Sequence, residues 1–118
     1  MPNIEGKNLS TPDETRTPDK TVIEVVHVTG AEIGRFTFQP GWRWSECIKP
    51  VVGTDSCQAE HLGYVLSGRI GVSHADGTKA DLGPGDAYRI APGHDAWVIG
   101  DEPFVGIELK SAATYAKG

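Results

Sequence analysis

Short runs of strand-forming residues alternate with turns along most of this chain, and this alternation restricts its fold more than any other feature. Fifteen glycines and eight prolines are spread over the sequence, a distribution typical of many short strands joined by turns. Neither a helical period nor an internal repeat is present. The runs that suit a pleated sheet lie at 21–28, 33–39, 42–48, 60–66, 69–74, 78–82, 87–90, 96–99 and 104–110. The sequence therefore predicts an all-β fold, either a sandwich or a barrel.

The connections between these runs carry residues that tight turns need. Asp76-Gly77 predicts a hairpin, because glycine accepts the positive φ of a two-residue turn. Pro40-Gly41 predicts another turn. Residues 49–58 form a longer connection, which we expect to be a loop, and long loops often carry function.

The strand expected at 60–66 has two different faces, because successive side chains of a strand point to opposite sides. One face carries a titratable nitrogen, a missing side chain and a small apolar group, from His61, Gly63 and Val65. The other carries large apolar side chains that we expect to pack, from Leu62, Tyr64 and Leu66. Space beside a histidine, on a strand that packs on its other side, predicts the wall of a small barrel with a pocket.

Length and charge limit the organisation and the partners. The chain suits one domain with a modest core. Residues 1–20 are polar, contain three prolines and predict an N-terminal arm, either mobile or laid along a neighbouring surface, before a domain at 21–118. A net charge of −5 without a Lys/Arg cluster argues against nucleic acid as a partner.

The sequence also predicts no membrane association. No apolar stretch approaches the length of a membrane span, and the N-terminus lacks the apolar core of a signal peptide. We therefore expect a cytoplasmic protein. Its two cysteines, Cys47 and Cys57, cannot build a disulfide framework, and three states remain open: free thiols, metal ligands or a single bridge.

Several glycine- and proline-containing stretches resemble the skeleton of the cupin superfamily. They are Pro40-Gly41, Tyr-Val-Leu-Ser-Gly at 64–68, Gly85-Asp86 and Ala91-Pro92-Gly93, and the resemblance extends over about 21–113. Pro-Gly-Trp-Arg-Trp-Ser-Glu at 40–46 and Pro-Gly-His-Asp-Ala-Trp at 92–97 look like small bacterial single-domain cupins. The resemblance implies a double-stranded β-helix, or jelly-roll barrel, after the polar arm. It also implies a homodimer, since small cupins are commonly dimers.

The metal positions of the family are altered in this chain. The two histidine slots of the first cupin motif fall on Cys47 and Lys49, and its glutamate slot falls on His61. The histidine slot of the second motif falls on Ala96, but His94 lies two residues earlier, which preserves the side-chain direction in an extended segment.

A divalent-metal site can still be assembled from these residues. We expect His61 and His94 as ligands, with Cys47 or Glu46 as the third ligand and Cys57 as a less favoured alternative. Imidazoles with a thiolate or a carboxylate suit zinc, and imidazoles with one carboxylate suit Fe(II), Mn or Ni. The alternative is a polar pocket in which the two histidines only form hydrogen bonds. No organic cofactor is indicated.

Four residues are candidates for a substrate pocket. Trp42, Trp44 and Tyr88 offer flat apolar surfaces to a small organic ligand, although core or dimer packing is the alternative for each. Gly63, on the same face as His61, is expected to leave a void. No residue is assigned a catalytic role.

Three classes of function fit this fold, and the fold cannot decide between them. The first is an enzyme, a metal-assisted isomerase, lyase, cyclase or oxygenase that acts on a small organic molecule. The second is a barrel that binds or senses a small ligand without metal or catalysis, and the third is a structural barrel. His61 and His94 with a possible third ligand favour the enzyme, while Cys47 and Lys49 in the former histidine slots favour the other two classes.

Overall fold

The computed structural model describes residues 3–109 and 115–116 as a β-rich fold with two short helices. The strands are β1 (Glu14–Arg16), β2 (Thr21–Val28), β3 (Ala31–Phe38), β4 (His61–Ser67), β5 (Arg69–His74), β6 (Lys79–Leu82), β7 (Ala87–Ile90), β8 (His94–Ile99) and β9 (Phe104–Glu108). The helices are α1 (Trp44–Cys47) and α2 (Lys49–Val52). The all-β prediction is confirmed.

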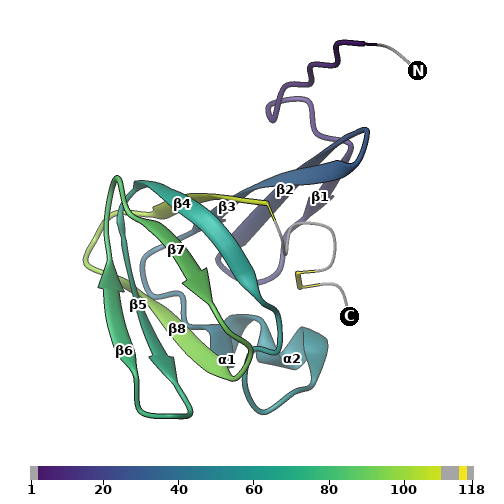
Figure 1. The fold of residues 1–118 in the computed structure, drawn as a ribbon. Helices are drawn as coiled ribbons and strands as arrows, with labels where there is room; N and C mark the ends of the chain where they lie inside the picture. The colour runs from purple at the N-terminus through teal and green to yellow at the C-terminus, as the bar shows by residue number, and fades with distance from the viewer. Residues whose placement is uncertain (1–2, 110–114, 117–118) are drawn as a thin grey trace.

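The strands form two antiparallel sheets, shown in Figure 1. One has six strands in the order β1-β2-β3-β9-β4-β7, and the other has three in the order β6-β5-β8. The helix α1 lies at one end of the barrel beside β8, and α2 packs against α1. Because β4 and β8 belong to different sheets, side chains from their inner faces can meet inside the barrel.

Aromatic and β-branched side chains fill the space between the sheets. Ile23 and Val25 of β2 are fully buried, as the β-branched run at 21–28 predicts. The ring of Phe38 stacks on that of Trp42 with centroids 3.8 Å apart and on that of Phe104 with centroids 5.6 Å apart. This stack joins β3, β9 and the segment before α1 in one core.

The strand β4 has the alternation that the sequence predicts. His61 is 5% exposed and Val65 is fully buried, both on the inner face. The outer face differs from the expectation, since its apolar side chains are not packed: Leu62, Tyr64 and Leu66 are 46%, 46% and 48% exposed. The outer face of β4 is therefore an apolar surface of the single chain.

The segment at 42–48 is not the extended run that the sequence predicts, because α1 occupies Trp44–Cys47. Asp95 explains the difference: its carboxylate accepts hydrogen bonds from the backbone N–H of Ser45 at 3.2 Å and from the Ser45 hydroxyl at 3.1 Å. This contact between distant parts of the chain stabilises a helical turn that the alternating pattern does not indicate. The predicted loop at 49–58 likewise begins with the helix α2.

The predicted arm at 1–20 contains a strand. Within β1, Glu14 pairs with Val25 and Arg16 with Ile23, so regular structure begins before Thr21. The chain before β1 extends away from the barrel in Figure 1. Most of the predicted tail at 111–118 lies outside the described residues. No helix in the described part of the chain is long and apolar enough to cross a membrane.

Two glycines with positive φ differ in how much space surrounds them, and this predicts different tolerance of a side chain. Gly68, between β4 and β5, has φ 74°, and a β-carbon there would overlap the backbone of Pro103 and Phe104. Gly77 has φ 95° and no atom within 4 Å of such a carbon. Gly68→Ala should lower the free energy of unfolding by more than about 3 kcal/mol, and Gly77→Ala by only about 1–2 kcal/mol. Urea denaturation measures both, and equal losses would contradict the packing at Gly68.

Candidate metal centre

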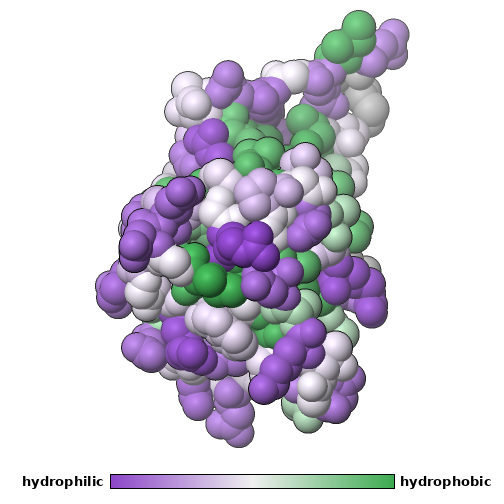
Figure 2. All heavy atoms as spheres, turned by 90° about the vertical axis from the view of Figure 1, so that its left-hand side faces the viewer, coloured by the Kyte–Doolittle hydropathy of each residue, from purple (hydrophilic) through white to green (hydrophobic). Residues whose placement is uncertain are grey.

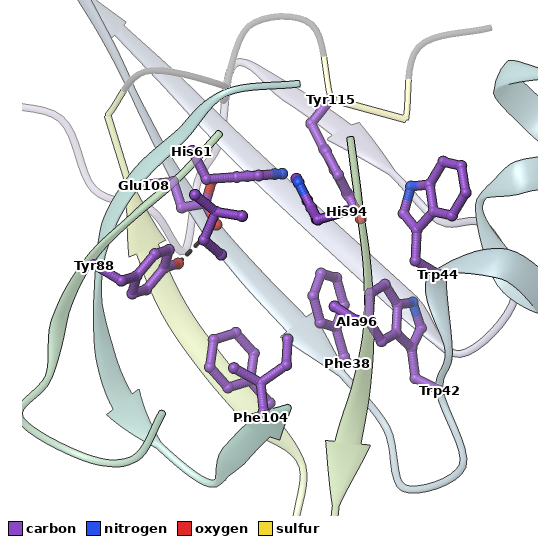
Figure 3. A pocket seen from close by; sticks show the side chains of 12 residues that line it. Phe38, Trp42, Trp44, His61, Tyr88, His94, Ala96, Phe104, Glu108 and Tyr115 are labelled. Atoms are coloured by element: carbon purple, nitrogen blue, oxygen red, sulfur yellow. Dashed lines mark hydrogen bonds and ion pairs between the residues drawn. The ribbon is translucent and has the colours of Figure 1, made fainter. Parts of the chain in front are cut away.

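Three side chains that can bind a metal ion converge inside the barrel: Cys57, His61 and His94. Their ligand atoms all lie within 4.8 Å of one another, and all three residues are buried. His61 begins β4 and His94 begins β8. In Figure 3 their rings point toward each other across the barrel. We refer to this group as the Cys57–His61–His94 cluster.

Backbone hydrogen bonds hold Cys57 beside the start of β8. The N–H of Cys57 donates to the carbonyl oxygen of His94 at 2.7 Å, and the N–H of Gly93 donates to the carbonyl oxygen of Cys57 at 2.7 Å. The N–H of His94 also donates to the carbonyl oxygen of Cys57 at 3.3 Å, and Cys57 and His94 thus form an isolated antiparallel bridge. The loop after α2 is thereby fixed to the second sheet, and its thiol is fixed next to the imidazoles.

Both histidines are anchored through the same ring nitrogen. Nδ1 of His94 lies 2.8 Å from the carbonyl oxygen of Ala91, and Nδ1 of His61 lies 2.6 Å from Oε1 of Glu108. A carbonyl or a carboxylate can only accept, so Nδ1 carries the proton in each ring. Nε2 of each ring is the atom left to bind a metal, an arrangement typical of metal-ligating histidines.

Glu108 is a functional candidate that the sequence analysis missed. It lies on β9, is 4% exposed, and its Oε2 accepts a hydrogen bond from the Tyr88 hydroxyl at 2.7 Å. Burial and the adjacent Glu108 carboxylate both raise the pKa of Tyr88. The signal in the sequence was the alternation along β9, which places Glu108 on the same buried face as Phe104 and Gly106.

The void predicted beside Gly63 is filled by Tyr88. Gly63 pairs with Tyr88 across β4 and β7, and a β-carbon on Gly63 would lie 2.7 Å from the Tyr88 hydroxyl oxygen. The missing side chain at Gly63 therefore makes room for the phenol that contacts Glu108. It does not by itself provide space for a ligand.

The charges around the cluster favour a thiolate beside a protonated imidazole in the metal-free protein. Burial disfavours the Cys57 thiolate, but hydrogen bonds with His61 and His94 outweigh this and lower the pKa of Cys57 to about 6. Burial also disfavours a charged His61, but the negative charge of Glu108 outweighs it and raises the pKa of His61 to about 10.

The donor set fits a zinc ion. Sγ of Cys57 and Nε2 of His61 are 3.6 Å apart. Zinc–sulfur and zinc–nitrogen bonds of about 2.3 Å and 2.0–2.1 Å at a tetrahedral angle place the two ligand atoms roughly 3.6 Å apart. One thiolate and two imidazoles leave a fourth tetrahedral position for water or a ligand.

The other two ligand candidates from the sequence lie elsewhere. Cys47 is buried on α1 with its Sγ 3.8 Å from Oδ2 of Asp19, and burial raises its pKa. The side chain of Glu46 is 72% exposed, with Oε2 3.8 Å from Nε of Arg43. The helical turn at α1 separates both residues from the histidines. Cys57, the less favoured alternative, is the residue that lies beside the histidines.

The predicted aromatic residues surround a narrow inner cavity. Trp42, Trp44 and Tyr88 line it together with His61 and His94, and its volume is about 20 Å³. Such a volume holds about one water molecule. The inner cavity is therefore too small for an organic molecule.

A larger hollow reaches the cluster from outside, and we refer to it as the outer pocket. Its volume is about 240 Å³, and its lining includes Cys57, Trp44, Tyr115 and Val52 of α2. A second hollow of about 450 Å³ lies between β6 and β7, where Figure 2 shows apolar side chains surrounded by polar ones. Its lining includes none of the three cluster residues. Of these two hollows, the outer pocket is the one that a cluster residue, Cys57, lines.

The different thiol environments predict different reactivity in the metal-free protein. At pH 7, iodoacetamide should alkylate Cys57 before Cys47, because Cys57 is mainly thiolate above pH 6 and lines the outer pocket. The alkylation rate of Cys57 should rise near pH 6 rather than near its ordinary pKa of 9.0. Peptide mass spectrometry over a pH series measures both rates. Equal rates at the two cysteines would contradict the assigned environments.

Comparison with known proteins finds the fold but no sequence family: no protein-family model and no curated protein matches the chain. A protein of unknown function from Rhizobium leguminosarum is 19% identical with a TM-score of 0.65, over 91% of this chain and 95% of that one. The polyketide cyclase RemF from Streptomyces resistomycificus is 19% identical with a TM-score of 0.62, over 90% and 78%. A cupin-like protein from Thermotoga maritima is 17% identical with a TM-score of 0.53, over 76% and 67%. These likenesses establish the architecture: the chain has the cupin fold.

Proposed function

We propose that this protein binds a divalent metal ion at the Cys57–His61–His94 cluster and a small organic molecule beside it. The observation that carries the proposal is the convergence of three buried ligand atoms, with both imidazoles anchored at Nδ1. Sets of one thiolate and two imidazoles favour zinc over the Fe, Mn or Ni that the sequence also allows.

The proposed activity is a metal-assisted isomerase, lyase, cyclase or oxygenase reaction. A divalent ion at this position would supply a Lewis acid or a bound water of lowered pKa. The chain's own residues would hold and shield the reacting groups: Glu108 keeps the His61 ring oriented, and the aromatic walls exclude bulk water. A polyketide cyclase and an oxalate decarboxylase are among the proteins of similar fold, which supports an enzymatic role without identifying the reaction.

The alternative function is a barrel that binds or senses a small ligand without metal or catalysis. One observation favours it: the 3.6 Å contact between Cys57 Sγ and His61 Nε2 also suits a direct hydrogen bond. A thiolate and a protonated imidazole would then satisfy each other, and the cluster would be a polar element of the core.

Metal analysis of purified variants tests the proposal. Wild-type protein reconstituted with Zn²⁺ should hold one equivalent. Cys57→Ala, His61→Ala and His94→Ala should each lose it, because a buried three-ligand site loses most of its affinity with any one ligand. Inductively coupled plasma mass spectrometry gives the metal content, and circular dichroism shows whether each variant is folded.

Cys47→Ala is the matched control, since it removes the same functional group from the same chain. It should retain the full equivalent of zinc, and so should Glu46→Ala. Loss of zinc in either control, with retention in Cys57→Ala, would instead support Cys47 or Glu46 as the third ligand. A wild type that takes up no Zn, Fe, Mn or Ni would favour the metal-free barrel.

We also propose a homodimer, and the apolar surface on the outer face of β4 supports it. Its residues are Leu62, Tyr64 and Leu66, and Leu109 beyond β9 is 52% exposed as well. Apolar side chains that follow one strand in this way are typical of surfaces that a partner covers.

Light scattering tests the dimer. Wild type should have the mass of two chains, and the double variant Leu62→Arg/Leu66→Arg should have the mass of one, because two cations would be buried without partners at the interface. Thr78→Arg, on the exposed turn before β6, is the control and should remain dimeric. A wild-type mass of one chain would refute the dimer.

We also propose that the protein is cytoplasmic. Cys47 and Cys57 are both free thiols in the structure, which suits a reducing compartment.

A further inference from the structure

Among the described residues, the indole N–H of Trp44 is a buried donor without an acceptor. Trp44 is 2% exposed, and its Nε1 has no hydrogen-bond partner among the described residues. We propose that Trp44 Nε1–H donates to an oxygen atom of the ligand at the Cys57–His61–His94 cluster. The ligand class is then a small, largely apolar compound with a carbonyl, carboxylate or enolate oxygen. This inference rests on the proposed function, since the ligand is the small molecule bound there.

Trp44 lies where the two cavities of the site meet. It is the first residue of α1, and it lines both the inner cavity, with His61 and His94, and the outer pocket, with Cys57. In Figure 3 the nitrogen edge of its indole faces the interior, on the side where His94 and Tyr115 lie. A ligand that enters through the outer pocket toward the cluster therefore passes this N–H.

Trp42 also lines the inner cavity, but its indole N–H is satisfied within the chain. Its Nε1 donates to the hydroxyl oxygen of Thr21 at 3.0 Å, and its ring stacks on Phe38. Buried polar groups in native proteins almost always have a partner, so an orphaned donor at a pocket indicates an acceptor supplied from outside the chain. The Nε1 atom of Trp42 thus has an acceptor, and that of Trp44 has none among the described residues.

The lining of the outer pocket restricts the rest of the ligand. Ile48, Val52 and Ala59 give apolar contacts, and Thr54 and Gln58 are neutral polar residues. Among the described residues that line the outer pocket, none carries a Lys, Arg, Asp or Glu side chain. These residues offer no counter-charge to a phosphorylated or multiply charged compound, whereas an apolar body with one oxygen-bearing group would fit both the pocket and the Trp44 donor.

Water is the competing acceptor, because the inner cavity has room for about one molecule. Nuclear magnetic resonance of ¹⁵N-labelled, Zn²⁺-loaded protein separates the two cases. The three tryptophans give three indole N–H signals. Sodium acetate is the probe, because one of its oxygens can bind the metal while the other accepts a hydrogen bond. Ionic strength is held constant with sodium perchlorate.

Acetate should shift the Trp44 indole signal in a saturable manner and leave the signals of Trp42 and Trp97 in place. Trp44→Phe keeps an aromatic ring and removes the donor. It should bind one equivalent of zinc as wild type does, but its Kd for acetate should be about three- to tenfold weaker. If Trp44→Phe does not fold, the wild-type titration decides the question alone.

Two results would overturn the inference. If zinc is bound and acetate shifts signals of the cluster but not the Trp44 indole, the partner of Trp44 is water, and the proposed metal site stands. If wild type takes up no zinc, the proposed metal site is refuted, but the donor role of Trp44 is still tested. Acetate is then titrated into the metal-free protein. A saturable shift confined to Trp44 would then still support the donor role, and its absence would refute it.

Discussion

The arrangement of the site depends on the buried hydrogen bond between His61 and Glu108. The two groups are 2.6 Å apart, and both side chains are almost inaccessible to water. An ionised carboxylate is stable in such a place only with donors around it, and here an imidazole and the Tyr88 hydroxyl supply them. The same bond fixes which nitrogen of His61 faces Cys57 and His94. One interaction thus stabilises a buried charge and sets the geometry of the cluster.

The cluster also connects parts of the fold that are otherwise held separately. His61 comes from the six-stranded sheet, His94 from the three-stranded sheet, and Cys57 from the loop between α2 and β4. An ion bound by all three would link both sheets and this loop, so its binding free energy would add to the stability of the folded state. Occupancy of the site and rigidity of the barrel are therefore coupled in the proposed function.

In the proposed function, the metal ion and the organic ligand occupy different parts of the interior. Tyr88 occupies the space beside Gly63, and the aromatic residues reduce the inner cavity to about 20 Å³. In the proposed function, ligand selection would then depend on the outer pocket, which Val52 of α2, Tyr115 and Trp44 line. This arrangement would allow a barrel with a dense aromatic core to bind the proposed small organic molecule.

The sequence by itself determined most of the strands and the direction of the histidines, because these depend on local patterns. Turn residues mark the ends of the runs at 21–28 and 69–74, and the period-2 alternation placed His61 on the inner face of β4. Only the tertiary structure decided the third member of the cluster. Asp95 stabilises a helical turn at α1 that places Cys47 and Glu46 away from the two histidines. A backbone bridge to His94 places Cys57 beside them. Only the tertiary structure shows the partners of Glu108 and the Tyr88 ring that fills the space at Gly63, because these contacts join strands far apart in the chain.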